Sequence, residues 1–131
     1  MSIMKDWKDA SPVPLESEEQ RTLFEWARRM QGKWHELNLL YHIPNEGKRS
    51  QRAGARLKAE GLRSGVPDIC LPVARGECHG LYIELKRRKN SRITEEQIWW
   101  IESLVQQGYA AAVCRGCDEA IKLITDYLNG R

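Results

Sequence analysis

Apolar and polar residues alternate one by one over residues 81–86, which read LYIELK. A period of two predicts a β-strand, because successive side chains on a strand point to opposite faces of the sheet. A second apolar run precedes it, and the segment 73–80 that separates the two has turn composition. The pattern therefore predicts an antiparallel hairpin in which Asp68 lies opposite Glu84. Lys86 follows two positions after Glu84, on the same face of the strand.

Other patterns frame this hairpin. Apolar residues three or four apart predict helices, and Gly and Pro mark their ends. In chain order the predicted elements are a helix at 15–31, a strand at 39–43, a helix at 50–61, the hairpin, a helix at 94–107, a strand at 109–114 and a helix beginning at Asp118. The strand at 109–114 is apolar throughout and is expected to be central. This order predicts an α/β fold, with a mixed sheet of about four strands flanked by helices.

The predicted helix at 94–107 carries two specific expectations. Thr94 and Gln97 form a capping-box pattern at its start. Its core-facing stripe is expected to consist of Ile98, Ile101, Leu104 and Val105. Trp99 and Trp100 are neighbours on the helix and cannot both face inward, so one of them is expected to be exposed or to lie in a partner surface.

The first predicted helix has three acids near its start. Helical phase puts Glu16 and Glu19 beside the apolar stripe, and Glu18 on the polar face. Ser17 and Gln20 resemble a capping box, which would leave Glu16 just outside the helix. An acid at a helix start also complements the helix dipole, so periodicity alone leaves the role of each acid open.

Composition sets the limits of the fold. The chain has 131 residues, of which 41% are hydrophobic and 30% are charged, and this suits one globular domain. Residues 1–14 contain two prolines and no periodicity and are expected to form a loosely ordered tail, with a single domain at 15–131. No membrane span or export signal is visible, so the expected location is the cytoplasm of the cell that makes the protein.

Positive charge is concentrated rather than large. The net charge is only +3, but one basic cluster spans 48–63 and a second spans 86–92. Arg52 and Arg56 lie in the predicted helix of the first cluster, where the only balancing acid is Glu60. Such a face suits contacts with phosphate oxygens, although it is also ordinary for a solvated helix.

The hairpin brings together two carboxylates and an ammonium. Asp68 and Glu84 repel each other unless something positive neutralises them, and a hard divalent cation such as Mg²⁺ or Mn²⁺ does this. Lys86 can then orient the attacking water or stabilise charge that develops on a phosphoryl oxygen. The alternative is that Glu84 and Lys86 are ordinary charged residues on a solvated strand face.

Four cysteines allow another chemistry. Cys114 and Cys117 form a CxxC pattern between a predicted strand and a predicted helix, and Cys70 and Cys78 raise the ligand count to four. A thiol-redox protein or a zinc site is therefore an alternative. The simpler interpretation is that all four are reduced thiols, with Cys70 and Cys114 packed in strands and the other two in loops.

The ordered motifs resemble the VRR-NUC family of the PD-(D/E)xK, restriction-endonuclease-like nucleases. The residues that carry this resemblance are Asn45-Glu46-Gly47-Lys48-Arg49, Gly65-Val66-Pro67-Asp68, Ile83-Glu84-Leu85-Lys86-Arg87, Gln97 and Gly108-Tyr109. The resemblance covers about 16–127. It implies a restriction-endonuclease-like fold and a metal-dependent, structure-selective nuclease that works as a homodimer without an organic cofactor.

The resemblance also assigns roles. It implies that Asp68, Glu84 and the backbone carbonyl of Leu85 hold Mg²⁺ or Mn²⁺, with a helical glutamate as an extra ligand. Spacing in the family pattern favours Glu16 over Glu19 for that position. Lys86 would position the attacking water, and Gln97 would either lie near the active site or serve only as a cap. The expected DNA contacts are Asn45, Lys48, Arg49, Arg52, Arg56, Arg87 and Arg88.

These features together predict an endonuclease that hydrolyses phosphodiester bonds in Holliday junctions or other branched DNA. One alternative is a flap or nick nuclease that acts as a monomer. Another is a DNA-binding module of the same fold without catalysis. The complete set of Asp68, Glu84 and Lys86 favours an enzyme, since an inactive copy would often lack one of them.

Overall fold

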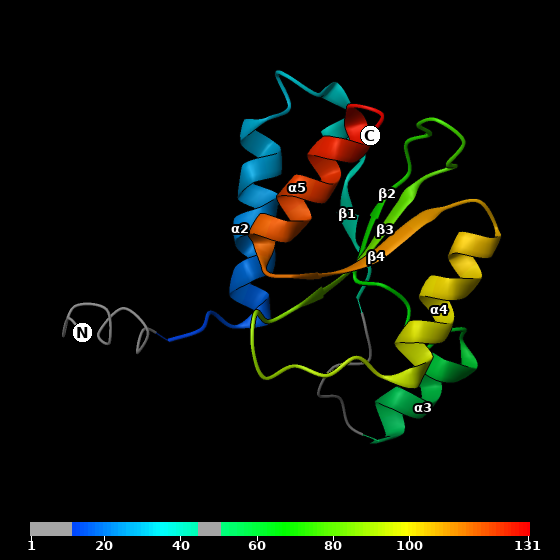
Figure 1. Ribbon diagram of the computed structural model, residues 1–131. Coiled ribbons are helices and arrows are strands. Elements are labelled where there is room, and N and C mark those ends of the chain that lie inside the picture. The colour runs from blue at the N-terminus through cyan, green and yellow to red at the C-terminus, as the bar shows by residue number, and fades with distance from the viewer. Residues whose placement is uncertain (1–11, 45–50) are drawn as a thin grey trace.

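A computed structural model describes residues 12–44 and 51–131 of the chain (Figure 1). The elements, in order, are helix α2 (Glu16–Arg29), 3-10 helix η1 (His35–Leu39), strand β1 (Tyr41–His42), helix α3 (Gln51–Ala59), strands β2 (Ile69–Leu71) and β3 (Leu81–Lys86), helix α4 (Glu95–Gln106), strand β4 (Ala110–Arg115) and helix α5 (Cys117–Leu128). The predicted α/β fold is confirmed. The expected strand at 39–43 is shorter, because its first residue belongs to η1.

The four strands form one mixed sheet in the order β1-β2-β3-β4. The β1–β2 and β2–β3 pairs are antiparallel, whereas β3 and β4 are parallel and are joined through α4. The hairpin prediction is correct: β2 and β3 pair with Ile69 opposite Ile83. Extending this register by one pair puts Asp68 opposite Glu84.

The central position in the sheet belongs to β3, not to β4. The prediction that the strand at 109–114 is central was wrong, because β4 pairs only with β3 and forms one edge of the sheet. Its residues are mostly half-buried, and only Cys114 is buried. Strand β3 is buried on both faces, contrary to the single buried face that its alternation predicted, since Glu84 and Lys86 are buried as well as the leucines.

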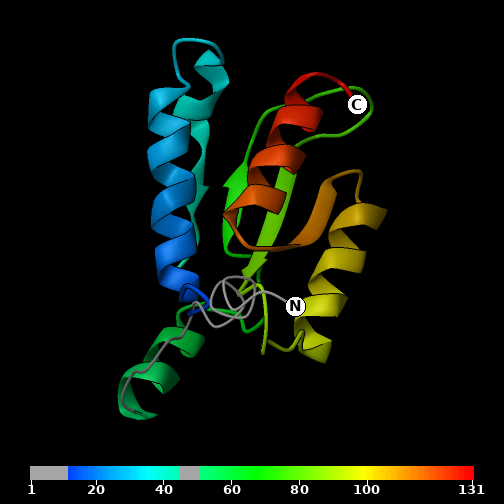
Figure 2. The same ribbon diagram turned by 60° about the vertical axis from the view of Figure 1, so that its left-hand side comes forward.

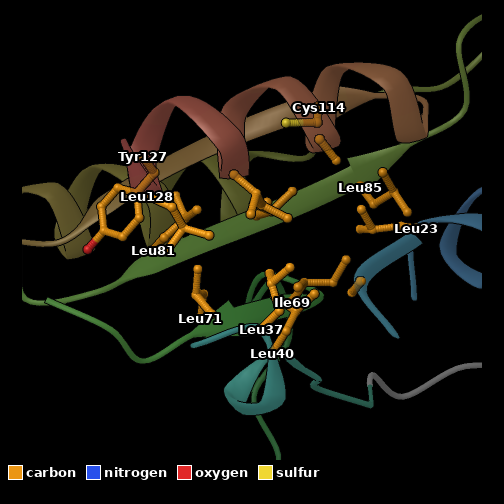
Figure 3. Packing of buried hydrophobic residues seen from close by; sticks show 14 of the residues in the cluster. Leu23, Leu37, Leu40, Ile69, Leu71, Leu81, Leu85, Cys114, Tyr127 and Leu128 are labelled. Atoms are coloured by element: carbon orange, nitrogen blue, oxygen red, sulfur yellow. The ribbon is translucent and has the colours of Figure 1, made fainter. Parts of the chain in front are cut away.

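The helices lie on the two sides of this sheet. Helices α2 and α5 pack against each other and against β3, and α4 contacts β4 (Figures 1 and 2). Figure 3 shows the core between α2, α5 and the sheet, where Leu23 and Leu85 meet at one end and Leu81 packs beside Leu128 at the other. Because side chains alternate along β3, its acid and lysine point away from this core.

Helix α2 begins at Glu16, so the expected capping box of Ser17 and Gln20 is not used. The N-cap residue is Leu15, and its backbone N–H donates to the Glu18 carboxylate at 3.0 Å. Glu18 thus satisfies an amide that lacks a partner within the helix, and Glu16 falls inside the first turn. The start of α2 lies at the same end of the molecule as the end of β3 (Figure 1).

Helix α4 is less buried than its pattern predicts. Ile98 is 43% exposed and Val105 is 52% exposed, so the prediction that both face the core was wrong. The reason is that α4 packs along the edge strand β4 rather than across the middle of the sheet. The expectation for the tryptophan pair is confirmed: Trp99 is 55% exposed, and Trp100 donates its Nε1–H to the Ser64 carbonyl at 3.0 Å.

The ends of the chain and of α5 add two details. Helix α5 begins at Cys117, one residue before its predicted start, and follows Gly116. Of the expected tail at 1–14, only residues 12–14 fall within the described part, where Arg87 donates to the carbonyls of Val13 and Pro14. Among the described residues, no helix has both the length and the apolar character that crossing a membrane requires.

Candidate active site

Two buried carboxylates meet where the hairpin strands begin and end. Asp68 is 4% exposed and Glu84 is 2% exposed, and a hydrogen bond links the two carboxyl groups. Asp68 Oδ2 also accepts the backbone N–H of Leu85 at 2.8 Å. In a regular β-ladder a backbone carbonyl of the neighbouring strand would accept this N–H, and here the Asp68 side chain accepts it instead. The contact holds the carboxylate against β3.

Pro67, the residue before Asp68, affects the backbone hydrogen bonding of Leu85 at this end of the strand. Continuing the register puts Pro67 opposite Leu85, where the two residues would exchange backbone hydrogen bonds. Proline has no N–H, so Pro67 cannot donate to the Leu85 carbonyl. A backbone oxygen is therefore directed to the same side of β3 as the Asp68 carboxylate. This is the oxygen that the resemblance assigns to a metal.

Burial controls the protonation of the carboxylate pair. The pKa of Glu84 is raised to about 10, first by burial and then by the hydrogen bond to Asp68 and the negative charge of Asp68, while Lys86 opposes the shift. The pKa of Glu16 is also raised, by burial and by Asp68, while Lys86 again lowers it. All four side chains thus interact electrostatically, and without a cation Glu84 keeps its proton at neutral pH.

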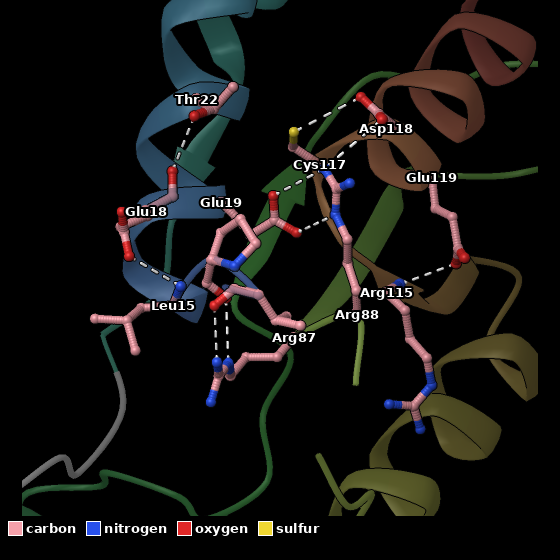
Figure 4. A network of polar contacts seen from close by, with 12 residues as sticks. Leu15, Glu18, Glu19, Thr22, Arg87, Arg88, Arg115, Cys117, Asp118 and Glu119 are labelled. Atoms are coloured by element: carbon pink, nitrogen blue, oxygen red, sulfur yellow. Dashed lines mark hydrogen bonds and ion pairs between the residues drawn. The ribbon is translucent and has the colours of Figure 1, made fainter. Parts of the chain in front are cut away.

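Of the two candidate helical acids, Glu16 faces this cluster and Glu19 faces elsewhere. Glu19 is buried, and its two oxygens accept from Arg88 Nε at 3.0 Å and Nη2 at 3.2 Å (Figure 4). Arg88 also approaches Asp118 at 3.6 Å, and Gly116 leaves the space that this guanidinium occupies. Glu19 therefore ties α2 to the end of β3, which leaves Glu16 as the acid available to the site.

Removing Arg88 is expected to destabilise the fold without touching the acid cluster. Arg88→Ala leaves the buried Glu19 carboxylate without its partner, which costs about 2 kcal/mol once the partial exposure of Arg88 is taken into account. Urea denaturation measures the loss. Lys89→Ala, the exposed neighbour, is the matched control and should change the free energy of unfolding by less than about 0.5 kcal/mol. Equal stability of both variants would contradict this role for Arg88.

Two other predicted site residues, Arg87 and Gln97, have definite contacts. Arg87 binds the carbonyls of residues 13 and 14, so it anchors the segment that precedes α2. The predicted capping box at α4 is confirmed, because Gln97 Oε1 accepts the Thr94 N–H at 2.9 Å and Thr94 Oγ1 accepts the Gln97 N–H at 3.1 Å. DNA contact by Arg87 and Arg88, and a role for Gln97 at the active site, stay predictions.

One further residue, His42, contacts the backbone of Asp68. His42 Nδ1 lies 3.0 Å from the Asp68 carbonyl oxygen, and the Ile43 N–H donates to the same oxygen at 2.6 Å. The two contacts fix the backbone of Asp68 from β1. A lone histidine on a short strand carries no signal for this role in the sequence.

The predicted DNA contacts in the first half of the chain divide into two groups. Asn45, Lys48 and Arg49 lie outside the described residues, as does the expected helix cap Ser50. Arg52 and Arg56 are exposed on α3, which lies at the end of the molecule where α2 begins (Figure 1). Their contact with DNA stays a prediction.

The cysteines have the character of structural thiols. All four are free, and Cys70 and Cys114 are buried in strands as expected. Cys117 was placed in a loop, but it is buried at the start of α5. Burial raises the pKa of Cys114 to about 12 and also raises that of Cys117, so neither thiol ionises readily. A high pKa disfavours both redox exchange and zinc binding at this CxxC.

The comparison with known proteins identifies the family. The VRR-NUC domain model matches residues 12–118. The chain belongs to the VRR-NUC domain family. A solved structure described as a VRR_NUC domain protein is similar at 32% sequence identity, with a TM-score of 0.80, over 92% of this chain and 93% of that one. No curated protein matches the chain. VRR-NUC membership makes this a nuclease-like domain and suggests DNA as its substrate.

The VRR-NUC site has the chemistry of a hard-cation site. Within residues 12–44 and 51–131, no three His, Cys, Asp or Glu side chains form a ready-made metal cage. Magnesium does not need one, because it is commonly held by one or two carboxylates and retains several waters. The buried pair of Asp68 and Glu84, with the Leu85 carbonyl beside it, fits this requirement. A cation would offset both the burial and the neighbouring negative charge that raise the pKa of Glu84, and would favour its ionised form.

The raised pKa predicts a specific pH dependence for the metal-free protein. Below the ordinary glutamate pKa of 4.5, Glu84 is protonated in the folded and the unfolded chain alike. Above it, the unfolded chain releases the proton while the folded chain retains it, so the free energy of unfolding falls as pH rises toward 10. Glu84→Gln keeps a donor for Asp68 and has no proton to lose. Its stability advantage over the wild type should therefore grow from pH 5 to pH 9.

Denaturant unfolding in EDTA measures both proteins across this range. Mg²⁺ should stabilise the wild type more at pH 9 than at pH 6, since metal binding must displace the Glu84 proton. The Glu84→Gln protein should gain little from Mg²⁺ at either pH. Parallel stability curves for the two proteins would contradict a buried, protonated Glu84.

Proposed function

We propose that the protein is a divalent-metal-dependent endonuclease that hydrolyses phosphodiester bonds in branched DNA, Holliday junctions included, and that acts as a dimer. The observation that carries the proposal is the buried pair of Asp68 and Glu84 with Lys86 beside it, in a chain of the VRR-NUC domain family. Two carboxylates buried side by side are costly for stability alone, and the chemistry of a nuclease accounts for them.

In this mechanism Asp68, Glu84 and the Leu85 carbonyl would hold Mg²⁺ or Mn²⁺, and Glu16 would add a further carboxylate to the site. The bound cation lowers the pKa of a water and withdraws charge from the scissile phosphate. Lys86 is 9% exposed, so its ammonium is held in place beside the carboxylates, where it orients the attacking water or donates to a phosphoryl oxygen. His42 keeps the Asp68 backbone fixed during the reaction.

The proposed dimer has a candidate surface. Ile98 and Val105 lie seven residues apart on one side of α4, and both are more than 40% exposed. Apolar side chains at this spacing form a stripe that a second copy would cover. A Holliday junction offers pairs of strands related by two-fold symmetry, so a symmetric dimer would present two active sites to it. A monomeric mass in light scattering at micromolar concentration would favour the flap or nick alternative.

A substrate panel tests the activity. Labelled junction, flap, nicked duplex, intact duplex and single strand are incubated with the protein in Mg²⁺, Mn²⁺ or EDTA. The proposal expects cleavage of the branched substrates, little cleavage of intact duplex, and none in EDTA. Cleavage in EDTA would contradict the metal requirement. Binding to all the DNAs without cleavage under any condition would instead support a DNA-binding module of the same fold.

A further inference from the structure

A hollow of about 430 Å³ lies between the first two turns of α4 and the end of α3 with the chain that follows it. Lys58 and Arg63 line it on one side, and Glu96, Trp99 and Trp100 line it on the other. Its volume is within the range of about 300–1,000 Å³ that is usual for small-molecule sites. The catalytic proposal makes no use of any of these side chains.

The two tryptophans of the hollow have different roles. Trp100 is part of the fold, because its Nε1 donates to the Ser64 carbonyl and the Arg63 guanidinium lies 5.5 Å from the centre of its ring. Trp99 stands edge-on to Trp100, with the rings 5.5 Å apart and inclined at 85°. This contact fixes the orientation of the Trp99 ring but leaves the side chain 55% exposed. Trp99 thus presents a rigid aromatic surface to solvent.

The charges around Trp99 suit one kind of ligand. An aromatic ring next to cationic side chains is the combination that binds a single-stranded nucleotide, with the base stacked on the ring and the phosphate near the cations. Arg63 keeps the N–H edge of its guanidinium for a phosphate while its face lies over Trp100. Glu96 repels phosphate, so the backbone of the strand would pass on the side of Lys58 and Arg63.

From this arrangement we infer that the hollow binds an unpaired nucleotide of the DNA, whose base stacks on Trp99. The inference rests on the proposed nuclease function and adds what the substrate must contain. In an intact duplex every base is stacked and paired, so none can reach Trp99 without being extruded. A branch point or a single-stranded end provides such a base at little cost. The hollow would therefore select for branched DNA.

The chain itself limits the distance between this hollow and the acid cluster. Ser64 borders the hollow and Asp68 lies four residues later, so their Cα atoms are at most about 14 Å apart. Gly65 holds this connection against α4: its φ is +87°, and a Cβ there would come within 2.8 Å of Glu96. The short connection keeps the hollow close enough to the acid cluster for one DNA strand to contact both.

Binding in EDTA tests the inference apart from catalysis. Two DNAs are compared by fluorescence anisotropy: a duplex with a single-stranded branch that carries 2-aminopurine next to the branch point, and a blunt duplex of the same sequence. Trp99→Leu should weaken binding to the branched DNA about fivefold to a hundredfold, and change binding to the blunt duplex by less than about twofold. Trp99→Phe should retain most of the affinity and the quenching of 2-aminopurine, because phenylalanine still stacks.

Trp34→Leu is the matched control, since Trp34 lies beyond the other end of α2 and contacts Lys33 rather than the hollow. It should bind both DNAs like the wild type, and thermal unfolding shows that each variant is folded. Equal loss on both DNAs, no loss on the branched DNA, or a Trp99→Phe protein as weak as Trp99→Leu would each overturn the inference. A failure of the catalytic proposal would be seen in a different experiment. The Asp68→Asn protein would still cleave DNA, and the DNA affinities measured in EDTA would be unchanged.

Discussion

Replacing Asp68 with asparagine is expected to slow cleavage of branched DNA at least about a thousandfold, with little effect on folding. The carboxylate supplies half of the negative charge that would hold the cation, and losing that charge removes several kcal/mol of transition-state stabilisation. Asparagine keeps an oxygen that can accept the Leu85 N–H, which is the contact that fixes this side chain against β3. The variant should therefore fold and bind DNA while cleaving it very slowly.

Single-turnover rates at saturating protein, in Mg²⁺ and in Mn²⁺, measure this loss independently of affinity. Asp118→Asn is the matched control: it makes the same chemical change at a side chain that is 82% exposed on α5. The control should cleave at nearly the wild-type rate. A rate for Asp68→Asn within tenfold of the wild type would remove Asp68 from the mechanism.

Lys86→Met is expected to lower the single-turnover rate about a hundredfold to ten-thousandfold, the usual contribution of a positioned proton-transfer or charge-stabilising group. Methionine has a similar length and suits a position that is 9% exposed, so the variant should fold. Lys86→Arg should not restore the rate, because a planar guanidinium differs in shape and hydration from the compact ammonium that the buried position accommodates.

Comparing the loss of single-turnover rate with the change in DNA affinity shows whether Lys86 acts in the chemical step or in DNA binding. The proposed role predicts a large loss of rate at saturating DNA and a small change in affinity, since one phosphate contact among several is removed. A variant that regains the wild-type rate when DNA is raised to saturation would show that Lys86 only binds DNA. The Arg variant reports separately on whether positive charge alone is sufficient.

The hairpin could be predicted because its signals are local. Alternation over 81–86 fixes which side chains share a face, and the short turn-rich connection fixes that the two runs are antiparallel. These two facts together place Asp68 directly opposite Glu84 on the paired strands, and the observed register agrees with this placement. What the sequence could not provide was the burial of both acids, since this depends on the neighbours on either side of β3.

The errors arise where position depends on distant partners. An apolar strand such as 109–114 has the same composition whether it is central or lies at an edge, because small residues are compatible with both. The stripe of α4 satisfies helical periodicity, but Ile98 and Val105 have only an edge strand to cover. Periodicity identifies a helix face and does not reveal how much sheet lies beneath it.

The choice between Glu16 and Glu19 illustrates the same limit within the site. Both acids suit the helical phase, and the apparent capping box of residues 17 and 20 would have left Glu16 outside the helix. The folded chain separates them through Arg88, which lies 69 positions after Glu19 and folds back to bind it. No local pattern predicts so distant a partner, whereas the proximity of Glu16 to Asp68 and Lys86 follows once α2 begins beside the end of β3.

The central claim is that Asp68 and Glu84 together hold one divalent cation. Anomalous diffraction from a crystal grown with Mn²⁺ tests it most directly, because manganese can be located independently of the refined atoms. The account predicts one strong anomalous peak within about 2.0–2.5 Å of oxygens from both carboxylates and near the Leu85 carbonyl. A protein that cleaves DNA with Mn²⁺ in solution, yet binds manganese in the crystal away from Asp68 and Glu84, would contradict it.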